Sequence, residues 1–475
     1  MGDRERMANE TVNLRLIVME MLMTVTEQKA ENRQYHGGMY SHIVVRDTLN
    51  RYNHLSGQQK SFIKRLFEGT LERMIEIDFV INAYSKVKTE KMKPVIRAIM
   101  RLSVYQILYM DSVPDAAACN EAVKLAQKKG FSTLKGFVNG VLRTIVKNKE
   151  NIEYPSLSVK YSMPEWIVKL WTSQLGEEKT LDVLEGLLSE HPVTVRFRKA
   201  SVIEEVKTAL EDRGGSMEKH PYFEDAYKIL KTDDITRLPH YDDGGFVIQD
   251  TSSMLAVRSV LAGEFLSKLR ASGDSVRIVD ICAAPGGKSM LMTDLMRDTG
   301  INYTIEARDV SEKKVRLMQE NFARCGFDEK KVSAVVRDAT LCDACEKETA
   351  DIIIADVPCS GLGVIGKKRD IKYKITREQI NDIVSLQRCI LKTAVEMLKP
   401  DGRLLFSTCT INRVENEENF EWLKDELKMT PVSLNDALPK CIHSETTEEG
   451  YLQLLPKLHD TDGFFISVLK KQGGV

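Results

Sequence analysis

The chain has 475 residues, of which 43% are hydrophobic and 29% charged, a size that suggests roughly three domains that each bury a core. Its 68 Lys and Arg residues nearly balance its 69 Asp and Glu residues, so the net charge of −1 provides no overall attraction to nucleic acid or membranes. No apolar run approaches the roughly 18 residues of a membrane-spanning helix, the charged start predicts no signal peptide, and the 9 dispersed cysteines are expected to be reduced thiols. These features exclude a disordered chain, a secreted disulfide scaffold and a membrane protein, and they predict a cytoplasmic location.

Residues 1–150 are predicted to form an all-helical domain, because their apolar residues recur at helical spacing without strand-like alternation. The mostly apolar segment 95–110 is expected to be the central helix, and amphipathic helices are expected at 120–130 and 137–149. Charge is unevenly distributed here. The domain holds 24 basic and 16 acidic residues, and 11 of the basic residues but only 3 of the acidic ones lie within 91–149. We therefore expect one basic face on this domain.

Residues 151–240 are expected to form a small connecting domain of helices and strands. Helical patterns cover 165–176 and 181–191. An alternating strand pattern at 193–199 and a further helical pattern at 202–214 follow them. This part is predicted to be a small α/β unit.

Residues 241–475 show a different pattern, in which short runs rich in Val and Ile alternate with helical segments. The expected strands are 276–281, 303–310, 332–339, 350–357 and 402–409. Such alternation predicts a doubly wound, mostly parallel, Rossmann-like sheet with helices on both faces. Because ligands bind at the carboxyl ends of the strands in such sheets, the residues that follow each strand are the candidate site.

The first three strand ends carry residues that suit a nucleoside. The first strand continues into CAAPGGKS, where Gly286 and Gly287 permit a tight turn ahead of a helix N-terminus. The second and third strands end at Asp309 and Asp338, whose carboxylates could accept hydrogen bonds from ribose or line a base pocket. Each feature alone is as typical of an ordinary turn or strand end. Together they predict a cofactor that contains a nucleoside.

The fourth and fifth strand ends each carry a thiol. Cys359 follows Asp356 in DVPCSG, and Cys409 lies in FSTCT. The plain alternative is that both are small residues that fill the sheet edge. A chemical interpretation is methylation of cytosine C5. In this reaction a thiolate adds to C6, C5 attacks an electrophilic methyl group, a base removes the C5 proton and the thiolate leaves. An acid such as Asp356 would then contact N3 of the base.

A metal is not expected in this chemistry. Cys342-x-x-Cys345 is a lone pair without the second Cys or His pair of a zinc site.

Several of these segments resemble a known family. CAAPGGKS, ARDVSEKK, ADVPCSGLG and FSTCTINRVENEENF resemble successive motifs of the RNA cytosine-5 methyltransferases of the Nop2/Sun group. RLSVYQILYMDSVPDAAACNEAVKLA and FVNGVLR are similar to the NusB-like RNA-binding domain. The likeness covers nearly the whole chain and is weakest at about 195–240, where VRFRK replaces the family's usual R-V-N strand. It implies a Rossmann-like methyltransferase behind a NusB-like domain, with S-adenosylmethionine as cofactor and small-subunit (16S) rRNA as substrate.

The resemblance also implies roles for individual residues. Cys409 is implied as the nucleophile, and Cys359 as the group that assists release of the product or acts as the base. The implied cofactor residues are Cys282, Ala283, Ala284, Pro285, Gly286, Gly287, Lys288, Asp309, Asp338 and Asp356. DNA cytosine methyltransferases use the cysteine of the P-C motif instead, so spacing alone leaves the choice of nucleophile open.

The segment 366–377 follows the P-C motif and contains six basic residues. A solvated surface loop is the plain alternative, but its position after the motif favours contacts to RNA phosphates. The expected RNA contacts are Lys367, Lys368, Arg369, Lys372 and Lys374. We further expect a monomer that binds rRNA.

Two other functions compete with this interpretation. An exocyclic-amine methyltransferase would carry an [N/D]-P-P-[Y/F] motif after the fourth strand, which Asp356-Val357-Pro358-Cys359 does not match. A non-catalytic RNA-binding assembly factor would need neither the paired thiols nor the CAAPGGKS loop. Titration with S-adenosylmethionine would distinguish the assembly factor from an enzyme.

Overall fold

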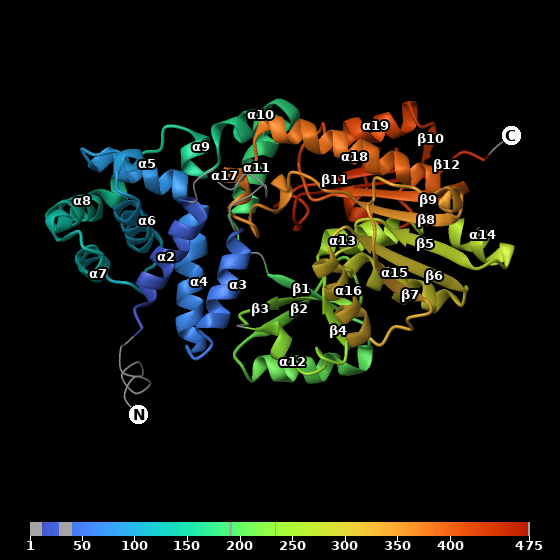
Figure 1. Ribbon diagram of the computed structural model, residues 1–475, viewed down its shortest axis with the longest axis horizontal. Coiled ribbons are helices and arrows are strands. Elements are labelled where there is room, and N and C mark those ends of the chain that lie inside the picture. Colours follow the sequence, from blue (N-terminus) through green and yellow to red (C-terminus); the bar gives the residue numbers. More distant parts are fainter. Residues whose placement is uncertain (1–11, 28–39, 190–191, 233, 474–475) are drawn as a thin grey trace. The chain divides into compact units, whose positions relative to one another are not determined.

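The computed structural model describes residues 12–27, 40–189, 192–232 and 234–473, which divide into two compact units (Figure 1). Unit 1 comprises Met1–Thr172 and Ile365–Lys374, and unit 2 comprises Ser173–Val364 and Ile375–Val475. The expected absence of a signal peptide concerns in part residues 1–11, which lie outside the described residues. Among the helices that are described, none is both long and apolar enough to cross a membrane.

Unit 1 is helical, as predicted. Its longer helices are α2 (Leu14–Thr26), α3 (Ser41–Arg51), α4 (Gly57–Glu72), α5 (Met74–Tyr84), α6 (Pro94–Tyr109), α7 (Asp115–Lys128) and α8 (Lys135–Asn148). The predicted central helix is α6, which starts at Pro94, where a missing backbone N–H costs nothing. Ile99 and Leu102 on α6 are completely buried in one core with residues of α2, α4, α5, α7 and α8. The short α9 (Leu157–Lys160) and α10 (Glu165–Leu175) follow.

A segment from the second half of the chain completes unit 1. Ile365–Lys374, which includes the short helix α17 (Ile371–Lys374), follows the P-C motif and belongs to the helical unit. Tyr373 donates its hydroxyl hydrogen to the Leu71 carbonyl at the end of α4 (2.9 Å). This long-range return of the chain was not predicted.

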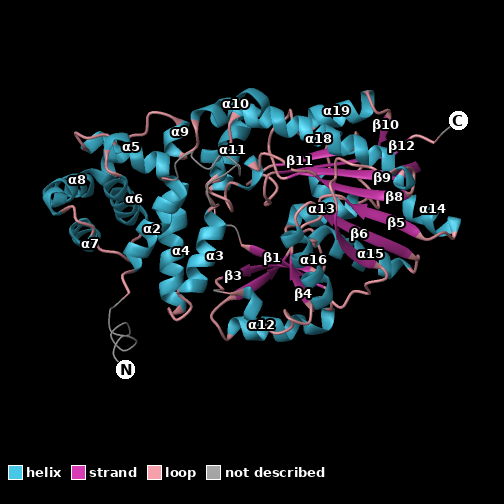
Figure 2. Ribbon diagram, viewed as in Figure 1, coloured by secondary structure: helices cyan, strands magenta, loops and turns pink. Residues whose placement is uncertain are grey.

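Unit 2 contains the predicted sheet, with strand order β10-β12-β9-β8-β5-β6-β7 and β11 paired to β12 (Figure 2). Its strands are β5 (Val276–Asp280), β6 (Tyr303–Asp309), β7 (Val332–Val336), β8 (Ala350–Asp356), β9 (Leu398–Thr408), β10 (Met429–Pro431), β11 (Tyr451–Leu454) and β12 (Phe464–Lys471). β5 to β9 are parallel, which confirms the five predicted strands. β12 adds to β9 in the antiparallel direction and extends the sheet beyond the prediction.

Helices cover both faces of this sheet. They are α13 (Thr251–Ser259), α14 (Phe265–Ser272), α15 (Gly287–Thr299), α16 (Glu312–Arg324), α18 (Arg377–Met397), α19 (Glu417–Asp425) and α20 (Glu445–Glu448). α13, α15 and α16 lie on one face, and α18 and α19 lie on the other (Figure 2). Successive residues of the central strand serve opposite faces, because Ile278 packs with the first group of helices and Val279 with the second. The carboxyl end of β5 therefore lies between two well-packed layers of helices.

A smaller antiparallel sheet precedes the large one in unit 2. It has the order β2-β3-β1-β4. Its elements, with the two helices of this region, are α11 (Glu177–Leu187), β1 (Val193–Phe197), α12 (Ile203–Glu211), β2 (Ser216–Lys219), β3 (Ala226–Leu230) and β4 (Phe246–Ile248). The helices and β1 were predicted, whereas β2 to β4 were not. The division between unit 1 and unit 2 comes after Thr172, and the predicted domains with boundaries at 150 and 240 stay predictions.

Candidate active site

The loop after β5 is shaped for close approach of a ligand. Gly286 precedes α15 with a φ of +98°, a conformation that favours glycine. A Cβ atom at this position would lie 2.9 Å from the ring of Phe322, so there is also no room for a side chain. Gln249 donates its amide to the Gly287 carbonyl (2.8 Å) and accepts a hydrogen bond from Arg196 on β1 (2.9 Å). The small sheet thus supports the loop through Gln249.

Lys288 joins this loop to the end of β8. Its ammonium donates to Asp356 Oδ2 (2.7 Å), while Ser407 on β9 donates to Asp356 Oδ1 (2.9 Å). Burial opposes the charge of Lys288, but the attraction of Asp356 and the hydrogen bond to it outweigh burial and raise the pKa of Lys288. Three neighbouring strand ends are therefore linked through the Asp356 carboxylate.

Asp280 lies beneath the same loop. Its side chain is completely buried, and Ser289 donates to its Oδ2 atom (2.7 Å). Burial raises the pKa of Asp280 to about 7. Its Oδ1 atom has no hydrogen-bond partner among the described residues.

The two other predicted carboxylates differ in their surroundings. Asp309 ends β6, is nearly buried, and accepts a hydrogen bond from the Ser311 backbone N–H (3.0 Å). Asp338 lies two residues after the end of β7 and is exposed. It accepts hydrogen bonds from the hydroxyl and backbone N–H of Thr340, which lower its pKa. Asp309 and Asp356 thus end the two strands that flank β5, whereas Asp338 caps a turn after the edge strand.

The structure brings the two predicted thiols together. Cys359 Sγ and Cys409 Sγ lie 3.2 Å apart, and neither forms a disulfide. The hydrogen bond with Cys409 and burial raise the pKa of the Cys359 thiol well above its usual value. The backbone N–H of Gly363 donates to the Cys409 carbonyl (3.1 Å), and a Cβ atom on Gly363 would lie only 2.9 Å from that carbonyl oxygen and 1.9 Å from that of Gly463. Backbone packing that only glycine allows thus fixes the Cys359 loop against the Cys409 loop.

The five basic residues that were predicted to contact RNA differ in their exposure and in their ion pairs. Lys367 and Lys368 are exposed. Arg369 pairs with Glu68 and Glu72, and Lys374 pairs with Asp370. Lys372 is the clear departure. It is 2% exposed and donates to the carbonyls of Glu72 (2.7 Å) and Ser162 (2.6 Å), because its segment packs into unit 1. The structure does not support contact between Lys372 and a phosphate.

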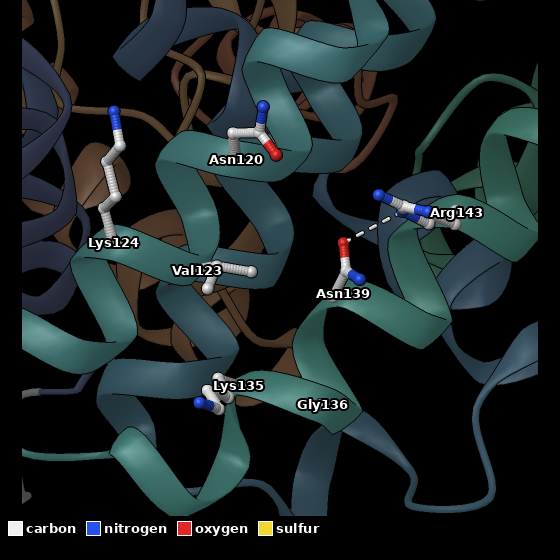
Figure 3. A pocket seen from close by; sticks show the side chains of 7 residues that line it. All are labelled: Asn120, Val123, Lys124, Lys135, Gly136, Asn139 and Arg143. Carbon is white, nitrogen blue, oxygen red and sulfur yellow. Dashed lines mark hydrogen bonds between the residues drawn. The ribbon is translucent and has the colours of Figure 1, made fainter.

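Ion pairs neutralise some of the basic residues that were expected to form a basic face on unit 1. Arg97 and Arg101 are ion-paired with Glu27 and Asp78. The remaining basic residues include those around a cavity of about 470 Å³ between α7 and α8 (Figure 3). It is lined by Asn120, Val123, Lys124, Lys135, Gly136, Asn139 and Arg143. The structure pairs neither Lys135 nor Arg143 with an acidic side chain of a described residue.

Several residues that hold the site were not identified from the sequence. Gln249 lies in the segment QDTSSMLA and Ser407 lies two residues before Cys409. Gln387, buried on α18, donates to the Pro358 carbonyl (2.9 Å) and so supports the P-C motif. Their partners are distant in the sequence, so no local pattern could indicate these contacts. Among the described residues, no group of three or more His, Cys, Asp or Glu side chains is arranged to hold a metal ion.

Comparison with known proteins agrees with this architecture. A NusB family model matches residues 12–147, and the model of 16S rRNA methyltransferase RsmB/F matches residues 268–470. The crystal structure of PH0851 has a TM-score of 0.73 at 23% identity and covers 97% of this chain and 99% of that one. NSun6 from Pyrococcus horikoshii has a TM-score of 0.54 at 21% identity and covers 66% and 99% respectively. The chain therefore has a NusB domain that is followed in the sequence by a methyltransferase domain.

Sequence relatives specify the family. The probable ribosomal RNA small subunit methyltransferase B of Bacillus subtilis is 32% identical, over 97% of this chain and 99% of the relative. The ribosomal RNA small subunit methyltransferase B of Cronobacter sakazakii is 28% identical, over 88% and 92% respectively. This chain belongs to the ribosomal RNA small subunit methyltransferase B family.

Proposed function

We propose that this chain transfers a methyl group from S-adenosylmethionine to C5 of a specific cytosine in small-subunit (16S) ribosomal RNA. The observation that carries the proposal is the pair of thiols after β8 and β9, whose sulfur atoms lie 3.2 Å apart. The names of the relatives support the RNA substrate. A cytoplasmic location is part of the same proposal.

The residues of the β5 loop fit the cofactor. The proposed set is Cys282, Ala283, Ala284, Pro285, Gly286, Gly287, Lys288, Asp309, Asp338 and Asp356. The absence of room for a side chain at Gly286, directly before a helix N-terminus, favours close approach of a ligand to the backbone. Asp309 is buried at the end of β6, the strand next to β5. In such sheets a carboxylate at this place accepts hydrogen bonds from the ribose hydroxyls. Bound S-adenosylmethionine supplies an electrophilic methyl group at this edge.

Cys409 is proposed as the nucleophile. Its thiolate adds to cytosine C6, and the electron pair of the C5–C6 bond then makes C5 able to attack the methyl group. This attack breaks the bond between the methyl group and the cofactor sulfur and leaves S-adenosylhomocysteine. A base then takes the C5 proton, the electron pair of the C5–H bond re-forms the C5–C6 double bond, and the S–C6 bond breaks with its electrons on Cys409. Cys359 keeps its proton, because burial and hydrogen bonding raise its pKa. It can therefore donate a hydrogen bond to the Cys409 thiolate during release.

The contact to cytosine N3 is assigned to Asp356. An adduct at C6 places negative charge on the ring, which a proton or hydrogen bond at N3 neutralises. The ion pair of Asp356 with Lys288 holds the Lys288 ammonium, a proton donor, against the Asp356 carboxylate at the end of β8, three residues before Cys359. Asp356 thereby belongs to both the cofactor site and the base site.

RNA affinity is assigned mainly to exposed lysines and to unit 1. Lys367 and Lys368 are exposed. The cavity between α7 and α8 offers Lys135 and Arg143 together with amide groups, which suit a phosphate backbone (Figure 3).

The direct test is to incubate the full chain with S-adenosylmethionine and small-subunit rRNA, both as free RNA and in the subunit, and to map 5-methylcytosine by bisulfite sequencing. We expect a single modified cytosine with the unchanged chain and none with Cys409→Ala. Methylation at an exocyclic amine, or full activity of Cys409→Ala, would contradict the proposal. Calorimetric titration with S-adenosylmethionine separates this enzyme from a non-catalytic RNA-binding factor.

A further inference from the structure

A buried polar network connects the residues that follow the two thiols. Ser360, next to Cys359, shares a hydrogen bond between its hydroxyl and that of Thr410, next to Cys409 (2.7 Å). Glu415 receives the backbone N–H of Ser360 at Oε1 and the Ser360 hydroxyl at Oε2, both at 2.7 Å. Asn412, from the Cys409 loop, donates its amide to the same Oε2 (2.7 Å). One carboxylate therefore binds donors from both thiol loops.

The neighbouring residue holds the Cys409 loop alone. Asn416 accepts the Thr408 hydroxyl (2.5 Å) and donates to the Thr410 carbonyl (3.1 Å), so it fixes the residues on either side of Cys409. Asn416 makes no hydrogen bond to the Cys359 loop among the contacts of the described chain. Of these two neighbouring residues, Glu415 therefore links the two loops, whereas Asn416 does not.

A carboxylate is the group that this position requires. Glu415 is completely buried, and three donors converge on its two oxygens. Burial raises its pKa, although its donors oppose that effect. A glutamine of the same shape would turn an amide N–H₂ toward the N–H₂ of Asn412 or toward the Ser360 donors, because it accepts at one end only. The cost of burying a carboxyl group is therefore offset only if all of these donors stay in place.

We propose that Glu415 is a positioning residue that holds the Cys359 loop against the Cys409 loop, so that Cys359 stays within reach of the sulfur that leaves the base. This role rests on the proposed two-thiol function, and it deepens that function by naming a side chain that, together with the backbone packing at Gly363, holds the spacing of the thiols. A negative charge at Glu415 also contributes to the raised pKa of Cys359.

The spacing of the thiols can be measured without RNA or cofactor. In the full chain, diamide removes two electrons and two protons from a pair of nearby thiols, forms an S–S bond and is itself reduced to the hydrazine. We expect peptide mass spectrometry to show rapid Cys359–Cys409 disulfide formation in the unchanged chain and in Glu418→Gln, an exposed residue in the first turn of α19. In Glu415→Gln the rate should fall about 10-fold, because loss of the link lets the loops separate.

Whether the rate of disulfide formation falls or rises in Glu415→Gln distinguishes a positioning role of Glu415 from an effect of its charge on the pKa of Cys359. Removal of a negative charge alone would lower the pKa of Cys359 and make disulfide formation faster, so an unchanged or increased rate in folded Glu415→Gln would overturn the proposal. If Glu415→Gln does not fold, Ser360→Ala removes only the hydroxyl contacts, and a disulfide rate equal to that of the unchanged chain would equally overturn it.

Turnover provides the second readout. With S-adenosylmethionine and small-subunit rRNA, Glu415→Gln should accumulate the covalent protein–RNA adduct, as expected for Cys359→Ala. A slow disulfide together with no adduct in any variant would leave the positioning role intact and refute the proposed function. If Glu415→Gln forms the disulfide at the normal rate and Cys359→Ala accumulates the adduct, the positioning role of Glu415 is refuted and the proposed function stands.

Discussion

The ion pair between Lys288 and Asp356 is the contact that links the cofactor loop to the base site, and its energy can be measured. The Lys288 side chain is 10% exposed and that of Asp356 is 31% exposed. Loss of one partner of a buried pair costs roughly 3–5 kcal/mol, and the partial exposure of Asp356 favours the lower end, about 3 kcal/mol. In a double-mutant cycle of Lys288→Met and Asp356→Asn, we expect a coupling energy of about 2 kcal/mol.

Hydrogen–deuterium exchange of the β5 and β8 peptides is the suitable assay, because the chain has two units and global unfolding is not expected to be two-state. A local loss of about 3 kcal/mol corresponds to exchange about 100-fold faster in these peptides. Lys399→Met is the matched control, since Lys399 pairs with Asp351 near the other end of the β8–β9 pair (2.8 Å) but is more exposed, and it should cost less than about 1 kcal/mol. A coupling below about 0.5 kcal/mol would refute the view that Asp356 holds the loop.

Three further predictions concern other parts of the molecule. Gly286→Ala should destabilise the β5 loop by about 2 kcal/mol, because residue 286 has a positive φ and a Cβ atom there would press on Phe322. Calorimetry should show weaker binding of S-adenosylmethionine to this variant, and binding as tight as that of the unchanged chain would contradict the prediction. Burial lowers the pKa of Lys372 from 10.5 to about 7, so the unfolded chain binds a proton that the folded chain does not, and the stability of unit 1 should rise from pH 7 toward 10.5 by up to a few kcal/mol. Lys372→Met should remove this part of the rise, as measured by exchange in α4, and identical pH profiles would refute the assignment. Neutralisation of Lys367 and Lys368 should weaken RNA binding and reduce the slope of log K against log salt by about 0.7 for each phosphate that the lysines no longer neutralise, whereas an unchanged slope would exclude phosphate binding by these lysines.

The central sheet could be predicted from the sequence because its signals are local. The Val- and Ile-rich runs before Asp280 and Asp356 specify β5 and β8, and the residues after them could be placed at one edge of the sheet by topology alone. Cys359 and Cys409 could be placed at the same edge by this argument, and the structure brings them together because β8 and β9 are neighbours.

The remainder depends on contacts between distant residues. Short strands such as β2 and β10 carry too few residues for a clear alternation, and β12 joins the sheet only through its pairing with β9. Lys372 looked like a surface cation because nothing near it in the sequence indicates that Glu72 and Ser162 enclose its ammonium. The roles of Gln249 and Glu415 likewise arise from partners far along the chain.

The most direct test of the two-thiol account is the identity of the cysteine that is covalently bound to RNA. Full-length Cys359→Ala is incubated with S-adenosylmethionine and small-subunit rRNA, denatured, digested with nuclease and protease, and analysed by mass spectrometry for a peptide that carries a nucleotide. We expect a methylated pyrimidine nucleotide on Cys409, and no such peptide when Cys409 is also replaced by alanine. A nucleotide on another residue, or adducts that form only when Cys409 is replaced and Cys359 is intact, would contradict it.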